Sequence, residues 1–451
     1  MLRPMAPNSA LFLMGETREQ PMHVAGLQLY SPPPGQSALD VRELFDEAMQ
    51  DGQISPLFLK RPRRSLATLG QWAWQNDDEF DIEHHVRHNA LPQPGGVRDL
   101  LALCGQLHSS SLDRQRPLWE MHLIEGVQDG RFATYFKVHH SLMDGTSALR
   151  LLNRVLSSDP DERDMPAPWA PLRDCGSRSS PEASPSALAD LALKSAGDLT
   201  SIGPMLLRRM VSGASGQQAP RTMFNVPITG SRRVAARAWP LDRLRAICKI
   251  TGTTVNDVVL TLCSGALRSY LLAAEALPDE PLIAMVPVAL PRGGESGDGG
   301  GNAVGAVLCN LGTTHPHPVQ RLESVRDSMA AGKAELAGMS RLQVLALSGL
   351  ALSPIAVQHV LRTAGRVRPP FNVVISNVPG PRRAKYWNGA RMEALFPMSL
   401  PLDGQALNIT CTSYADDMVF GVVGCRRTVP HLQRLLTFLD DELSALEAAL
   451  D

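Results

Sequence analysis

The segment YFKVHHSLMDGTSALRLL, from Tyr135 to Leu152, joins a strand-like run to a helix-like run through a short turn. Successive side chains of a strand point to opposite faces, so the adjacent His139 and His140 are expected on different sides of it. Beyond the turn at Asp144 and Gly145, apolar residues recur at helical spacing and predict a helix. The two histidines therefore cannot do the same work.

The face that carries His140 is the more apolar one, because Thr134, Phe136 and Val138 share it. We therefore expect His140, rather than His139, to point inward. Loss of hydration lowers the pKa of an imidazole and keeps it neutral near pH 7. A neutral imidazole can accept a proton, so His140 is the predicted general base.

Asp144 follows His140 by four residues and stands next to Gly145. It can fold back to hydrogen-bond an imidazole, or pair with an arginine to fix the turn. A triad of Ser141, His140 and Asp144 is disfavoured, because neighbours in a strand point apart and the chain contains no Gly-x-Ser-x-Gly elbow. A base without a protein nucleophile indicates direct transfer, in which a bound hydroxyl or amine loses its proton to His140 and attacks an activated acyl group.

A second histidine cluster lies in EHHVRH, which contains Glu83, His84, His85 and His88. His84 and His88 have the i, i+4 spacing of a helical zinc pair. The surrounding sequence is not typical of a helix, and no Glu stands between the ligand histidines as in H-E-x-x-H. A polar patch on the surface or between lobes is favoured over a metal site.

Length and composition narrow the class of protein. A chain of 451 residues predicts two or three domains, and 44 Lys and Arg against 45 Asp and Glu create no overall field for nucleic acid or anionic lipid. Seven scattered cysteines without a C-x-x-C pair favour a reducing, cytoplasmic compartment. The apolar run ALFLM is too short for a signal peptide, and Val344–Leu361 predicts a buried or interfacial helix pair rather than a membrane span.

Strand-like and helix-like runs alternate in two lobes, 1–157 and 231–451. Residues 158–230 are rich in Pro, Ser, Gly and Ala and predict a crossover linker. Within it, residues 186–213 predict a helix packed on a lobe, with a lid or membrane-surface helix as the alternative. The run GGESGDGGG lacks the Gly-Lys-Ser/Thr of a phosphate loop and predicts a flexible loop. The expected strands are 23–30, 118–127, 131–140, 232–241, 281–290, 371–380, 406–414 and 418–427, and the expected helices are 38–49, 98–112, 146–156, 242–252, 254–274, 319–360 and 429–450.

Several segments together resemble one known family. HHSLMDG matches the HHxxxDG motif of the CoA-dependent acyltransferase superfamily, and QPMHVAGLQLY, DRQRPLWEMHLIEG, TVNDVVL, FNVVISNVPGP, YWNGARMEALFP and ALNITCTSY follow in the order of the bacterial wax ester synthase/acyl-CoA:diacylglycerol acyltransferase family. The resemblance spans nearly the whole chain. It implies a two-lobed α/β (α+β) fold like that of chloramphenicol acetyltransferase, with mixed sheets flanked by helices. It also implies a tunnel between the lobes that admits acyl-CoA from one side and a lipid alcohol from the other.

The resemblance also implies roles for individual residues. It makes His140 the general base, His139 a supporting residue, and Asp144 with Gly145 the structural partners of the turn. Asn256 or Asn377 is implied as a donor to the tetrahedral oxyanion, a role whose loss typically costs ~3 kcal/mol. The other matching residues are Pro117, Leu118 and Trp119 of a PLW motif, Asp257 beside Asn256, and Ser376 at the start of SNVPGP.

Packing at the junction of the lobes is an equal alternative for the PLW and SNVPGP motifs. Arg382 and Arg383 are candidates for binding the CoA phosphates, which require cationic side chains or helix N-termini. The loop GGESGDGGG departs from the charged or bulky residues that the family often has there, which puts substrate contacts of that loop in doubt.

The implied function is long-chain acyl-CoA-dependent O-acyl transfer, giving wax esters from fatty alcohols or triacylglycerol from diacylglycerol. Acyl-CoA is then a substrate and no cofactor or metal is expected. Lipid substrates imply a cytoplasmic protein peripheral to the inner membrane face or to lipid droplets. The alternatives are an idle lipid- or acyl-binding protein on the same scaffold, and a condensation-type enzyme acting on carrier-bound thioesters.

Overall fold

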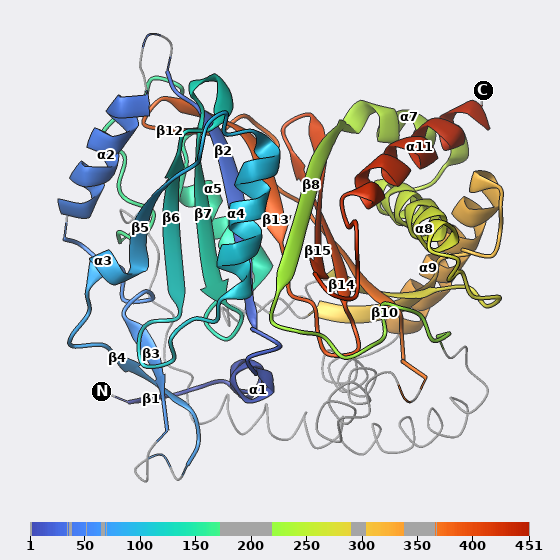
Figure 1. The fold of residues 1–451 in the computed structure, drawn as a ribbon, viewed down its shortest axis with the longest axis horizontal. Coiled ribbons are helices and arrows are strands. Elements are labelled where there is room, and N and C mark those ends of the chain that lie inside the picture. The colour runs from blue at the N-terminus through green and yellow to red at the C-terminus, as the bar shows by residue number, and fades with distance from the viewer. Residues whose placement is uncertain are drawn as a thin grey trace.

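The computed structural model describes residues 2–33, 35, 38–50, 52–64, 68, 70–171, 219–289, 304–337, 366 and 368–450. Two six-stranded mixed sheets stand side by side in it, each with helices against it (Figure 1). The α/β fold class predicted from the sequence is confirmed. The expected helix at 186–213, the segment Val344–Leu361 and the loop GGESGDGGG lie outside the described residues.

The first sheet has the strand order β12-β13-β2-β7-β6-β5. Its strands are antiparallel except for the parallel pair β5 and β6. The helix α4 packs on one face of it through Leu100, Leu101 and Cys104. The bounds are β2 (His23–Ser31), β5 (Val86–Ala90), β6 (Trp119–Glu125), β7 (Phe132–His139), β12 (Tyr386–Trp387), β13 (Ala390–Met398), α2 (Ala38–Gln50), α3 (Ile82–His85), α4 (Val97–Ser109) and α5 (Gly145–Val155).

The second sheet has the order β10-β9-β11-β14-β15-β8. Its central strand β11 is parallel to both neighbours, and the remaining pairs are antiparallel. Helices α8, α9 and α11 pack together, and their apolar side chains form one core with the sheet. The bounds are β8 (Arg232–Pro240), β9 (Ile283–Ala289), β10 (Val304–Asn310), β11 (Val373–Val378), β14 (Leu407–Tyr414), β15 (Asp417–Cys425), α7 (Leu241–Thr251), α8 (Val255–Ala273), α9 (Pro318–Ala337) and α11 (Arg434–Ala448).

The two sheets are tied together by β13, a strand from the C-terminal half that completes the first sheet. It pairs with β2 from Arg391 opposite Ser31 to Met398 opposite Ala25. It also packs against β15, where a Cβ at Gly421 would collide with the carbonyl of Pro397. No strand was expected at β13, and the division into 1–157, 158–230 and 231–451 stays a prediction.

A smaller unit lies beside the first sheet. It contains the short sheet β1-β4-β3 and the helix α1, which precedes β2. Within the described ranges, no single helix is long and apolar enough to cross a membrane, and α7 with α8 passes only as a pair bent by 105°. The bounds are β1 (Arg3–Pro4), α1 (Pro7–Gly15), β3 (Lys60–Arg63) and β4 (Ala73–Asn76).

Candidate active site

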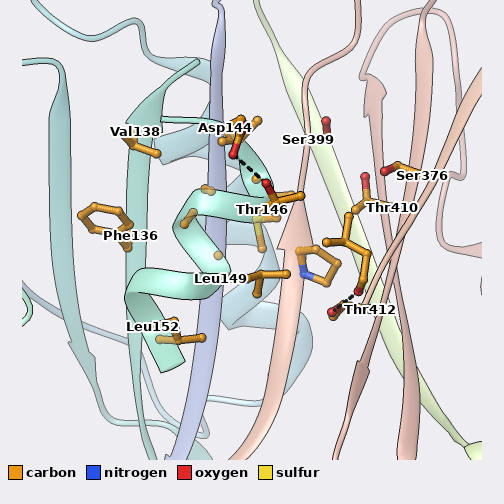
Figure 2. A pocket seen from close by; sticks show the side chains of 18 of the residues that line it. Phe136, Val138, Asp144, Thr146, Leu149, Leu152, Ser376, Ser399, Thr410 and Thr412 are labelled. Atoms are coloured by element: carbon orange, nitrogen blue, oxygen red, sulfur yellow. Dashed lines mark hydrogen bonds between the residues drawn. The ribbon is translucent and has the colours of Figure 1, made fainter. Parts of the chain in front are cut away.

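A cavity of about 520 Å³ lies between the two sheets and is lined mainly by apolar side chains. This volume is in the range of small-molecule sites. Figure 2 shows α5 on one wall and strands of the second sheet on the other. The first half contributes β2, β7 and α5, and the second contributes β9, β10, β11, β13 and β14. A substrate in this cavity would touch both halves of the chain.

His140 lies on the cavity side of β7. Thr134, Phe136 and Val138 line the cavity with it, so the placement predicted from strand alternation is confirmed. The main-chain nitrogen of His140 donates to the Met22 carbonyl at 2.8 Å. These contacts aim the imidazole into the cavity.

The electrostatic surroundings of His140 favour its neutral form. Burial lowers the pKa of His140 below the ordinary value, and the negative charge of Asp144 opposes this shift only in part. The Phe12 ring of α1 stacks on the imidazole, with centroids 4.1 Å apart and 17° between the planes. Near pH 7 the ring is therefore neutral and can accept a proton.

His139 is fully buried on the opposite face of β7. The main-chain N–H of Ser141 donates to its Nδ1 at 3.1 Å, so the neutral ring carries its proton on Nε2. That atom lies 3.5 Å from Oε1 of Glu16, whose other carboxylate oxygen pairs with Arg114 at 2.8 Å. His139 thus links the strand end to the segment after α1 and does not reach the cavity.

Asp144 is the N-cap of α5. Its Oδ1 accepts from the Ser147 main-chain nitrogen at 2.7 Å and from the Thr146 hydroxyl at 2.9 Å. Burial raises the pKa of Asp144, but these bonds and the charge of His140 outweigh it, so the pKa lies below the ordinary value. Among the described residues, Asp144 neither hydrogen-bonds an imidazole nor pairs with an arginine. The turn is fixed by helix capping instead.

Gly145 lines the cavity beside Asp144. A Cβ at this position would meet no atom within 4 Å. The glycine therefore relieves no clash. It leaves the cavity open at the start of α5, next to the imidazole.

The PLW residues belong to the core and none of them lines the cavity. Trp119 is fully buried, donates from Nε1 to the Phe58 carbonyl at 2.8 Å, and stacks on His85. Leu118 packs in a small cluster with Leu13 of α1, and Pro117 is buried beside it. The packing alternative is the one that their positions support.

The SNVPGP strand β11 divides its side chains between two sides. Ser376 and Val378 line the cavity, whereas Asn377 does not and has Nδ2 3.5 Å from Oδ1 of Asn256. Asn256 does not line the cavity either. Asp257 forms a capping box with Thr254 at the start of α8. The structure therefore joins Asn256 and Asn377 to each other and not to His140.

The second histidine cluster does not form a metal site. The described part of the chain contains no group of three or more His, Cys, Asp or Glu side chains able to hold a metal ion. The helix α3 ends at His85, and His88 lies in β5 beside Glu125, at 3.2 Å. The break in the helix separates the two histidines that the i, i+4 spacing would have joined.

Several residues of the site were not predicted. Phe12, which stacks on His140, belongs to the apolar run ALFLM, and Glu16 and Arg114 are 98 residues apart in the sequence. Gln28 has a signal in the sequence that could have identified it, because it is a polar residue inside the apolar run HVAGLQLY. It lines the cavity opposite α5.

Comparison with known proteins gives consistent matches over the whole chain. Residues 5–259 match the wax ester synthase/diacylglycerol acyltransferase catalytic domain, and residues 300–447 match the WS/DGAT C-terminal domain. A Mycobacterium tuberculosis (H37Rv) protein named "Probable diacyglycerol O-acyltransferase tgs2" is 48% identical over 453 residues, 99% of each chain. The solved wax ester synthase/diacylglycerol acyltransferase from Marinobacter aquaeolei VT8 is similar with a TM-score of 0.81 and 41% identity, over 99% of both chains. A starter condensation domain of rhizomide synthetase shares the fold alone, at a TM-score of 0.59 and 11% identity, over 99% of this chain and 94% of that one.

Proposed function

The chain belongs to the wax ester synthase/diacylglycerol acyltransferase family, and from that premise we propose that it transfers a long-chain acyl group from coenzyme A to a lipid hydroxyl with His140 as general base. The observation that carries the proposal is the neutral imidazole of His140 in the wall of an apolar cavity between the two sheets. An apolar cavity suits alkyl chains, and a neutral imidazole suits proton transfer.

The reaction needs no covalent acyl-enzyme. His140 takes the proton of the acceptor hydroxyl while its oxygen attacks the thioester carbonyl, forming a tetrahedral intermediate. The intermediate collapses with cleavage of the carbon–sulfur bond, and the imidazolium returns the proton to the departing CoA sulfur. A fatty alcohol gives a wax ester in this step, and diacylglycerol gives triacylglycerol.

The developing oxyanion needs a hydrogen-bond donor in the cavity. The Asn256 and Asn377 pair is on the other side of β11, so we assign it to the junction of α8 and β11. The Ser376 hydroxyl lines the cavity and faces the start of α5 from the opposite wall (Figure 2). Ser376 is the better candidate for the oxyanion role.

Arg382 and Arg383 remain the candidates for the CoA phosphates. Both are exposed just after SNVPGP and form no ion pair with a described residue. Two exposed guanidinium groups that follow a cavity-lining strand suit an anionic substrate that enters from the surface.

A protein with lipid acceptors is expected to bind a lipid surface, and α1 has an exposed apolar face that suits such binding. Leu11 and Met14 are 64% and 67% exposed on the helix whose Phe12 covers His140. Burial is the main cause that lowers the pKa of Lys60, and the nearby charge of Arg3 lowers it further. Exposed apolar side chains on α1, which follows Arg3 closely in the chain, suit an anionic membrane or droplet surface.

The catalytic proposal is tested by His140→Ala. Release of free CoA from palmitoyl-CoA with hexadecanol should fall by about 10²–10⁴-fold, the usual contribution of a general base. Unchanged acyl-CoA binding and thermal unfolding would show that the loss is chemical. The matched control is His317→Ala at an exposed site, which should keep full turnover. Turnover by His140→Ala near that of the unchanged protein would exclude His140 as the base.

The docking proposal is tested by flotation with phosphatidylglycerol vesicles. The double variant Leu11→Asp/Met14→Asp should lose binding to the vesicles while it keeps turnover of a short, water-soluble alcohol. Equal flotation of the variant and the unchanged protein would move the docking surface elsewhere.

A further inference from the structure

Gln28 places an amide side chain in the wall of a cavity that is lined mainly by apolar residues. It lies in β2, is 5% exposed, and lines the cavity with Thr134, its register partner in β7. The Thr134 hydroxyl donates to Oε1 of Gln28 at 2.6 Å. Among the described residues nothing accepts a hydrogen bond from Nε2 of Gln28. The wall therefore holds an amide donor to which no described residue offers an acceptor.

Tyr30 extends this polar group by one more hydroxyl. It follows Gln28 by two residues, on the same face of β2, and lines the same cavity. The Thr134 side chain is close enough to oppose the rise that burial causes in the pKa of Tyr30, and the Tyr30 ring stacks on Phe132 with centroids 5.1 Å apart. We call Gln28, Tyr30 and Thr134 the polar floor.

The polar floor lies far from the reacting centre. Thr134 precedes His140 by six residues of one strand, and a strand rises about 3.3 Å per residue, which gives roughly 20 Å. The β7 side chains between them on the cavity face, Phe136 and Val138, are apolar, and Leu149 of α5 lines the same cavity. An alkyl chain whose reacting end lies at His140 can follow this apolar stretch and meet the floor with its far end.

Gly26 keeps the approach to the floor open. It lines the cavity one step nearer to His140 than Gln28 does. A Cβ at Gly26 would lie 2.9 Å from Nε2 of Gln28 and 3.8 Å from Cδ1 of Leu395. A larger side chain at position 26 would therefore fill the space just before the floor.

The amide donor of Gln28 should weaken the binding of an apolar chain that is long enough to reach it. A chain that stops short of the floor leaves Nε2 of Gln28 free to bind water. A longer chain displaces that water and buries the donor against methylene groups, which offer no acceptor. Building on the proposed acyl transfer, we propose that the polar floor sets the longest unsubstituted alkyl chain that the enzyme accepts, from either the acyl-CoA or the fatty alcohol.

The test compares chain-length profiles of kcat/KM. One series varies the saturated acyl-CoA with a fixed short alcohol, and the other varies the alcohol with a fixed short acyl-CoA. In the unchanged enzyme kcat/KM should fall at one length in one series, which identifies the substrate whose chain lies in the cavity. Gln28→Leu removes the donor at similar size and should raise kcat/KM about tenfold or more for chains just beyond that length. Shorter chains should be unaffected, because they do not reach residue 28.

Two further variants separate polarity from space. Gly26→Val should move the fall to shorter chains, because it fills the approach and displaces the amide of Gln28 without removing it. Gln128→Leu makes the same replacement in an exposed turn and should leave the profile unchanged. Identical profiles of Gln28→Leu and the unchanged enzyme in both series would overturn the proposal.

Binding gives a second measurement that does not depend on turnover. Calorimetric titration with the acyl-CoA series and with the alcohol series should show the same length limit, and Gln28→Leu should relax it. Equal limits in the two proteins would overturn the role of the floor. Intact length-dependent binding without any CoA release would overturn the acyl-transfer proposal alone.

Discussion

The two faces of β7 carry polar side chains in opposite ways. On the outer face, Tyr135, Lys137 and His139 are fully buried and each has a polar partner. On the cavity face, Phe136 and Val138 are apolar, and the polar residues Thr134 and His140 lie before and after them along the chain. On the outer face, which is the face of β7 opposite the cavity, the polar groups stabilise the fold. On the cavity face, the polar groups are available to a ligand.

The buried Lys137 on the outer face is held by one ion pair and two hydrogen bonds. Nζ of Lys137 lies 2.9 Å from Oε2 of Glu120 and donates to the carbonyls of Leu107 and Ser110 at 3.1 Å each. The last two belong to the end of α4, so the buried lysine also neutralises the helix C-terminus. Although burial raises the pKa of Glu120, its partners lower it to about 2. This face therefore depends on an ion pair that forms only in the folded state.

The largest effect is expected when that pairing is broken. Glu120→Ala leaves the Lys137 ammonium buried beside carbonyls alone, which should lower the free energy of unfolding by about 3–5 kcal/mol. Urea denaturation followed by far-UV circular dichroism measures it. The matched control is Glu447→Ala in the half-exposed pair with Arg243, which should cost ~1 kcal/mol or less. Equal losses in the two variants would remove the contrast between the outer face and an ordinary surface pair.

A smaller effect is expected from pH, through the buried His108 in the last turn of α4. Its Nε2 donates to the Ser399 carbonyl, so Nδ1 must accept from the Tyr135 hydroxyl, and both nitrogens are satisfied only in the neutral ring. Burial is the main cause that lowers the pKa of His108 to about 3. In the unfolded chain it titrates near 6.5, so this contribution to stability is complete above pH 6.5 and is lost as the pH falls toward 3.

Between these pH values, the titration of His108 should lower the free energy of unfolding by about 1.4 kcal/mol for each pH unit that the pH falls. Urea denaturation at pH 7, 6 and 5 measures the slope. His108→Asn, which cannot titrate, should have a shallower slope by that amount, although it is less stable at pH 7. The same slope in both proteins would place the acid sensitivity in other groups.

The residues of β7 that face the cavity could be predicted from the sequence, whereas the contacts around them could not. Alternation along one strand put His140 on the apolar face and His139 on the other, because period two is a local property. The same rule applied to β11 would have put Ser376 and Val378 on one side and Asn377 on the other, as the structure does. The family resemblance had directed attention to Asn377 instead.

Features that depend on distant segments were beyond this reasoning. The strand β13 pairs with β2 across more than half of the chain, and its own residues alternate too weakly to predict a strand. Phe12 and Glu16 reach the two histidines only because α1 folds back beneath the end of β7. Local periodicity contains no information on such contacts.

The smallest effect is expected at His140. The variant Asp144→Asn tests whether the charge of Asp144 changes the pKa of His140. Asp144→Asn keeps a good N-cap for α5, because an Asn side chain accepts the Ser147 N–H as well as Asp does. It removes the negative charge that raises the pKa of His140 against burial. The pKa of His140 should then fall further, since the largest cause that raises it is gone while burial still lowers it.

The acid limb of the kcat/KM profile against pH reports this shift, because protonated His140 cannot act as a base. In Asp144→Asn the limb should move to lower pH by less than about one unit, with kcat/KM at pH 7 reduced only modestly. Asp144→Ala also removes the cap and should cost about 1 kcal/mol of unfolding free energy in addition. An acid limb that stays in place in Asp144→Asn would mean that Asp144 serves the turn alone. The cavity face would then tune its base by burial, without help from a charge.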